Sequence, residues 1–222
     1  PTSDLNKNEN RISFRKIFKI DLTGNRNYFL LIGSRFVFLI GIYGVQTFAQ
    51  YFIRDVMQAE NPIQATGDLM AALAVALVLC SLIGGWLSDR IGARRVVVLA
   101  SVIAAAGSFL LIFAADLTSM TLYAGVLGAG IGFYLTSNWA LASRLAPKAE
   151  AGKFLGLTNL ATAGASAASK LAGIPIDLAN NANPGRFPGY YGLFFFGGVF
   201  ALLSLLLLRQ VKETRAEESE IS

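Results

Sequence analysis

The sequence has no histidine and a single cysteine, Cys80, which lies inside an apolar run. Disulfides need two cysteines, and zinc, haem and Cys/His catalytic sites depend on these two residue types, so we expect no cofactor and no metal. Charged residues make up only 15% of the 222 residues, where soluble domains have about a quarter. Hydrophobic residues reach 54% and the mean hydropathy is +0.53, which indicates an integral membrane protein. An enzyme is disfavoured, because no histidine, cysteine pair or intramembrane pair of acids is available.

The apolar residues gather in six segments, at about 28–52, 69–87, 96–115, 121–145, 154–176 and 190–208. Each is close to the ~20 residues that a helix needs to cross the hydrocarbon core, whereas strands of a barrel would be about half as long and would alternate in polarity. The sequence therefore predicts an all-α membrane protein with six transmembrane helices. We predict that residues 1–27 are either a solvated cytoplasmic linker or an amphipathic helix on the inner leaflet. Residues 209–222 are predicted to be a cytoplasmic tail.

The basic residues predict the orientation of these helices. Of the 19 lysines and arginines, 15 fall in the termini and in one set of loops, and only Arg54 and Arg186 fall in the opposite loops. The positive-inside rule then places both termini in the cytoplasm. The remaining two, Arg35 and Lys170, lie inside apolar segments.

The loop between the second and third segments, residues 84–95, reads GGWLSDRIGARR. So short and basic a turn between two membrane-length segments predicts a helical hairpin with its turn in the cytoplasm. Gly92 can adopt the positive φ that a tight reversal needs, and Asp89 can cap or pair with a neighbouring helix end.

This loop resembles the hallmark loop of the major facilitator superfamily, approximately G-x-L-[SA]-D-R-x-G-R-R, which joins the second and third helices of each six-helix half of those transporters. The matching positions are Gly85, Leu87, Ser88, Asp89, Arg90, Gly92 and Arg94, with Arg95 extending the basic run. Ala93 departs from the pattern, since an arginine is usual there. The alternative is a basic hairpin of an unrelated membrane protein.

A second loop, residues 146–156, resembles the P-x-x-x-R-G-x-x-x-G loop between the fourth and fifth helices of a facilitator half. Ala151 stands where the arginine is usual. Proline and glycine are common in any turn, so this loop alone is a weak signal. Its position, two helices after the first motif, strengthens the resemblance to the family.

The resemblance implies half of a facilitator fold, built as two three-helix repeats of inverted topology, with alternating access as the mechanism. The basic leader without an initiator methionine favours the C-terminal half, whose partner is the N-terminal half of the same transporter. Gly85, Asp89, Arg90, Gly92, Arg94 and Arg95 would form a conformational gate, here called the gate motif. The implied location is the cytoplasmic membrane of a prokaryote.

Polar groups at membrane depth are candidates for the substrate pathway, because they are expensive there. On the first helix, Arg35 and Gln46 lie within about 20° of each other, Gln50 follows one turn further, and Tyr43 is a further polar group. We expect this stripe to face a cavity. Arg35 could instead snorkel to the cytoplasmic headgroups or form a structural pair.

The fourth and fifth helices supply the other candidates. Asn138 and Trp139 could hydrogen-bond or stack on a sugar, and the preceding glycine run, from Gly125 to Gly132, indicates close packing. Asn159 and Lys170 share a face of the fifth helix, where Lys170 either snorkels outwards, pairs with Asp177 or meets the substrate.

The first helix also resembles the seventh helix of sugar-transporting facilitators, especially the sucrose/proton symporter branch, which favours a sugar as substrate. The two deep cations leave an organic anion as the next choice, and drug-like solutes remain open. No acid lies in the middle of any segment, so a coupling carboxylate for H+ or Na+ is expected in the other half. The alternatives are a self-sufficient homodimeric carrier or channel, and a facilitator-like receptor that does not transport.

Overall fold

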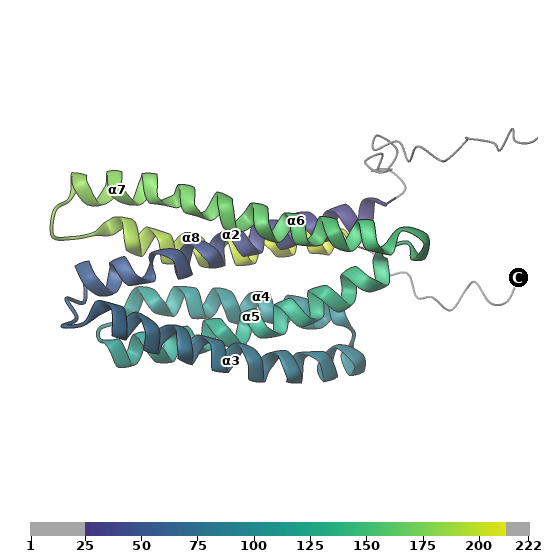
Figure 1. The fold of residues 1–222 in the computed structure, drawn as a ribbon, viewed down its shortest axis with the longest axis horizontal. Coiled ribbons are helices and arrows are strands. Elements are labelled where there is room, and N and C mark those ends of the chain that lie inside the picture. The colour runs from purple at the N-terminus through teal and green to yellow at the C-terminus, as the bar shows by residue number, and fades with distance from the viewer. Residues whose placement is uncertain (1–24, 212–222) are drawn as a thin grey trace, which may run out of the picture.

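The computed structural model describes residues 25–211, and these form helices joined by short connections (Figure 1). In chain order they are α2 (Arg26–Asp55), α3 (Pro62–Ile91), α4 (Ala93–Leu110), η1 (Leu111–Phe113), α5 (Leu117–Leu145), η2 (Lys148–Glu150), α6 (Ala151–Ser169), η3 (Lys170–Ala172), α7 (Gly173–Ala182) and α8 (Pro188–Arg209). The expected linker at 1–27 and tail at 209–222 lie mostly outside the described residues.

Five helices are long and apolar enough to cross a membrane: α2, α3, α4 with η1, α5 and α8. The expected helix at 154–176 is different, because it is divided into α6, the short 3₁₀ turn η3 and α7. Pro175 has no N–H to donate to the carbonyl of Leu171, so a regular α-helical hydrogen bond cannot form there. Polar residues such as Lys153 and Asn159 also keep α6 out of the set of helices that are apolar enough to cross a membrane.

Two other helices begin earlier than the apolar pattern predicts, because polar residues cap them. The Asn61 side chain accepts a hydrogen bond from the Gln64 backbone N–H at 3.1 Å, so α3 starts at Pro62 rather than near residue 69. Asp116 caps α5 in the same way, and the hydrogen bond from the Ser119 backbone N–H, 2.7 Å long, lowers the pKa of its carboxyl.

The helices lie in two groups, with α2, α6, α7 and α8 above and α3, α4 and α5 below in the view of Figure 1. Packing of α4 against α8 joins the two groups. A side chain bonds across this contact, since Ser108 of α4 donates to the carbonyl of Phe194 of α8 at 2.7 Å. Within the upper group, Ser34 of α2 donates to the carbonyl of Ser204 of α8 at 2.9 Å. Such hydrogen bonds between helices are valuable where no water competes.

Glycines let α5 approach its neighbours on two sides. A Cβ added to Gly130 would overlap the backbone of Ala104 on α4, and one added to Gly132 would overlap the carbonyl of Leu77 on α3. The interpretation of the glycine run as a packing surface is therefore confirmed for these two positions. Gly125 differs, since an added Cβ there would meet nothing within 4 Å.

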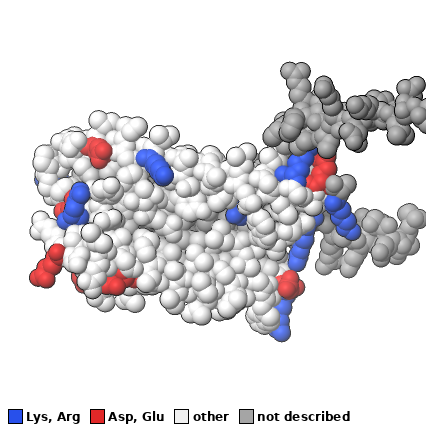
Figure 2. All heavy atoms as spheres, in the orientation of Figure 1, with Lys and Arg blue, Asp and Glu red and all other residues white. Residues whose placement is uncertain are grey.

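Charged side chains collect mainly at the two ends of the molecule, and a broad band between them is almost free of charge (Figure 2). The end that carries the turn between α3 and α4 is rich in arginine. This distribution is what a protein with a hydrocarbon-facing belt requires.

The packing of α5 generates a stability prediction. We expect Gly130→Leu to destabilise the protein by about 1–3 kcal/mol or more, because a side chain there forces α4 and α5 apart. Thermal unfolding in detergent measures the effect, with Gly125→Leu as the matched control that should unfold close to wild type. Equal midpoints for the two variants would contradict this packing.

Candidate functional site

The gate motif lies at the turn between α3 and α4. The helix α3 ends at Ile91, Gly92 has φ +93°, and α4 begins at Ala93. The Gly92 N–H donates to the carbonyl of Ser88 at 3.1 Å, so the last turn of α3 closes directly into the reversal. A side chain at this φ would be strained, which explains the glycine.

Two charged residues of the motif contact neighbouring side chains. Asp89 forms an ion pair of 3.5 Å with Arg144 in the last turn of α5, and 80% of the Asp89 side chain is exposed. Arg90 lies over the ring of Trp86, 4.2 Å from its centroid. Since Asp89 is so exposed, the pair with Arg144 leaves most of its carboxylate open to further partners.

The rest of the motif connects this turn with other helices. Arg94 donates from Nη2 to the backbone carbonyl of Arg209, at the end of α8, at 3.0 Å. A Cβ added to Gly85 would lie 3.6 Å from Thr136 of α5, in ordinary contact. Arg95 is exposed. The motif thus touches α5 and α8 at one end of the bundle.

Arg35 is the best-defined polar group inside the helical bundle. Its side chain is only 6% exposed, its Nη1 donates to Asn138 Oδ1 at 2.7 Å, and its Nε donates to Thr162 Oγ1 at 3.0 Å. The snorkelling alternative is therefore wrong for this arrangement, and Arg35 of α2 connects α5 with α6. Among residues 25–211, Arg35 makes no other hydrogen bond, so its Nη2 has no hydrogen-bond partner there.

The partners of Arg35 are held in place by buried neighbours. Asn138 is fully buried and donates from Nδ2 to the hydroxyl of Tyr134 at 3.5 Å. The ring of Tyr134 stacks on Phe38 with centroids 3.6 Å apart and 3° between the planes. Thr162 and Tyr134 were not among the site residues predicted from the sequence. The signal for Tyr134 was its place one turn before Asn138, on the same face of α5.

The other expected pathway residues do not join this cluster. Tyr43 and Gln46 are half-buried, and Gln50 is exposed. Trp139 is 40% exposed. Asn159 and Lys170 are exposed on α6 and η3, and within the described residues Lys170 forms no ion pair with Asp177 or any other acid.

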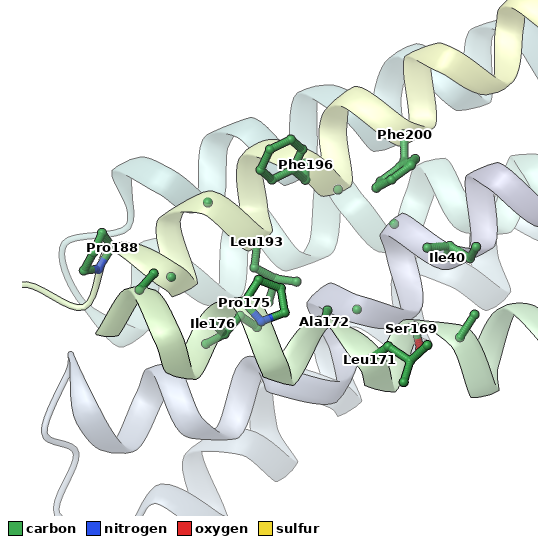
Figure 3. Close-up of a pocket in the computed structure, with 17 residues that line it drawn as sticks. Ile40, Ser169, Leu171, Ala172, Pro175, Ile176, Pro188, Leu193, Phe196 and Phe200 are labelled. Atoms are coloured by element: carbon green, nitrogen blue, oxygen red, sulfur yellow. The ribbon is translucent and has the colours of Figure 1, made fainter. Parts of the chain in front are cut away.

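Two of the cavities near the end opposite the gate motif differ in polarity. One, of about 530 Å³, is lined almost wholly by apolar residues of α2, α6, η3, α7 and α8 (Figure 3). The other, of about 510 Å³, is more polar and includes Arg54, Asp55 and Asp177 in its walls. Within residues 25–211, no cluster of three or more His, Cys, Asp or Glu could hold a metal ion.

The Arg35 cluster gives a second stability prediction. Asn138→Ala removes the acceptor of a charged, buried donor, so we expect a loss of about 1.5–3 kcal/mol in the free energy of unfolding. Denaturant unfolding in detergent measures this loss. Asn159→Ala, at an exposed position on α6, is the control and should have little effect. An equal loss in both variants would show that the Arg35–Asn138 bond contributes nothing.

Comparison with known sequences identifies the family. Residues 28–221 match the sequence model of the Major Facilitator Superfamily. The multi-drug resistance efflux pump PmrA of Streptococcus pneumoniae is 24% identical over 187 residues, which cover 81% of this chain and 45% of PmrA. The multidrug transporter protein MdtP of Bacillus subtilis is 27% identical over 123 residues, or 54% of this chain and 22% of MdtP. The chain thus spans less than half the length of these relatives.

Two solved structures share the fold. The inward-open xylose transporter XylE from E. coli superposes with a TM-score of 0.66 at 19% identity, over 84% of this chain and 48% of XylE. A second structure of XylE, described as a proton:xylose symporter and bound to 6-bromo-6-deoxy-D-glucose, gives a TM-score of 0.68 at 17% identity, over 85% of this chain and 45% of XylE. The chain is therefore a nearly all-helical, multi-pass membrane protein that belongs to the major facilitator superfamily.

Proposed function

We propose that this chain is the C-terminal six-helix half of a secondary transporter, which carries a small solute by alternating access between two halves. The family, the relatives' roughly double length and the six helical segments support this proposal. Its two repeats would be α2–α4 and α5–α8, with α6 and α7 forming one interrupted membrane segment, related by inverted topology. The partner would be the N-terminal half of the same transporter.

The proposed topology places both termini on the cytoplasmic side of a prokaryotic inner membrane. Residues 1–27 would link the halves, residues 28–208 would form the membrane part, and residues 209–222 would be a tail. The strong bias of lysine and arginine towards the gate-motif end supports this orientation.

The buried Arg35 cluster is the observation that carries the proposal for the substrate site. A permanent charge at membrane depth is expensive, and its bonded partners Asn138 and Thr162 are neutral, so Nη2 is available to a polar solute. Tyr43, Gln46, Gln50, Trp139, Asn159 and Lys170 would line the pathway once the second half is in place. A sugar or an organic anion fits such donors.

Efflux of drug-like compounds is the second candidate, since PmrA and MdtP carry the names of a multi-drug efflux pump and a multidrug transporter. A coupling carboxylate for H+ or Na+ would come from the other half, because the described acids lie away from the middle of the membrane helices. A homodimeric carrier or channel, or a receptor that binds without flux, would be distinguished by reading-frame length and by flux measurements.

The substrate site is tested through Arg35. Vesicles containing the intact protein are assayed with xylose, an organic anion and a fluorescent drug, and the solute that wild type moves is then tested on Arg35→Gln. We expect kcat/KM to fall about tenfold or more, the loss that one charged hydrogen bond accounts for. Arg186→Gln, an exposed loop arginine, is the control. Transport at the wild-type rate in Arg35→Gln would exclude Arg35 from the substrate site.

The proposed gate is tested through Asp89. If Asp89 stabilises the closed cytoplasmic side, Asp89→Asn shifts the population towards the inward-open state and slows transport. The rate of thiol labelling at Ser143→Cys, in a Cys80→Ala background, reports access from the cytoplasmic side. Glu150→Gln is the control, because Glu150 is another exposed acid, paired with Lys153 at 3.4 Å. Unchanged labelling and unchanged transport in Asp89→Asn would rule out this role.

A further inference from the structure

The apolar cavity of about 530 Å³ takes no part in the proposed solute site. Small and apolar side chains of α2, α6, η3, α7 and α8 form its walls, among them Ala172, Ile176, Leu193 and Phe200 (Figure 3). Its one polar side chain is Ser169, whose hydroxyl already donates to the carbonyl of Ser166 at 2.9 Å. The cavity therefore offers nothing that would replace the hydration shell of a sugar or an ion.

Glycines create this cavity. At its floor, α2 and α8 touch, since a Cβ added to Gly41 would lie 2.9 Å from the carbonyl oxygen of Gly197. Above the floor, Gly192 has no side chain, and a Cβ added there would meet nothing within 4 Å. The helices α2 and α8 thus pack closely at Gly41 and Gly197, and they leave an unfilled space at Gly192.

The rim of the cavity is continuous with an exposed apolar surface. Leu171 and Phe196, which line the cavity, are 65% and 57% exposed, and Leu178 beside them is 68% exposed. Bulky apolar side chains suit contact with hydrocarbon, whereas contacts between membrane helices favour small residues. The cavity consequently opens towards acyl chains rather than towards a second helical surface.

We propose that this cavity is a lipid site, filled by one acyl chain of a phospholipid in the leaflet next to the start of α8. Hydrocarbon depth supplies no water, and an apolar space stays dry in any case. If a cavity of this size were empty, the atoms of its walls would lack van der Waals contacts on one side. An acyl chain restores these contacts and is the most abundant apolar group at that depth.

The site is tested in vesicles of phosphatidylethanolamine and phosphatidylglycerol that contain the intact protein and a trace of phosphatidylcholine with a diazirine in mid-chain. After illumination, mass spectrometry maps the labelled residues. We expect strong labelling of the cavity walls on α7 and α8, and a loss of about tenfold in Gly192→Leu, because the new side chain replaces about two buried methylene groups of the lipid.

Two controls separate this effect from general contact with lipid. Labelling of the exposed α3 face, at Val78 and Leu82, should stay the same in every variant. Gly125→Leu adds the same side chain at another open helical glycine and should leave the cavity labelling unchanged. Cavity labelling that survives Gly192→Leu at the wild-type level would overturn the proposal.

A second measurement identifies any other occupant. With Phe196 replaced by p-benzoylphenylalanine, illumination in the same vesicles should give a phospholipid adduct. Crosslinks to another part of the protein or to a second copy, without lipid adducts, would assign the cavity to a protein contact and overturn the lipid site. This outcome is independent of transport, so failure here leaves the proposed function standing.

Discussion

Hydrocarbon around the chain is the constraint on which the structure depends. Every backbone N–H and C=O at membrane depth must find its partner within a helix, because no water is available there. Two 3₁₀ turns depart from the regular α-helix, namely η1 at the end of the α4 span and η3 before Pro175, and η3 packs against α2. Caps such as Asn61 and Asp116 act at the helix ends, where the unpaired groups meet water again.

Arg35 carries the buried charge on which the proposed solute site depends. Its charge lies inside the bundle, bonded to two neutral oxygen atoms from α5 and α6, which otherwise contact each other little. Neutral acceptors compensate a buried guanidinium only in part. We therefore expect a negatively charged or strongly polar group, from the solute or from the partner half, to complete the site during part of the transport cycle.

The sequence predicted what depends on local pattern and missed what depends on helix rotation. Hydropathy located the five helices long and apolar enough to cross a membrane, the spacing of Asp89 and Gly92 placed the turn between α3 and α4, and the crowded glycines of α5 indicated close packing. Whether Arg35 would snorkel or turn inward depends on which face α2 presents to α5 and α6, and no periodicity in one helix contains that information. Thr162 was missed for the same reason, since threonine is common in membrane helices and only its position opposite Arg35 makes it a partner.

The helix α2 separates two chemically different spaces. Ile40, Gly41 and Gly44, which line the lipid cavity, lie about 140° to 240° around the helix axis from Arg35. A polar site and an apolar site therefore occupy opposite faces of one rigid element. A polar solute on the glycine-lined face would leave its polar groups without hydrogen-bond partners. An acyl chain on the Arg35 face would leave the buried charge of Arg35 in contact with hydrocarbon. Small residues on one side of α2 and a single arginine on the other thus give this helix two faces of different polarity.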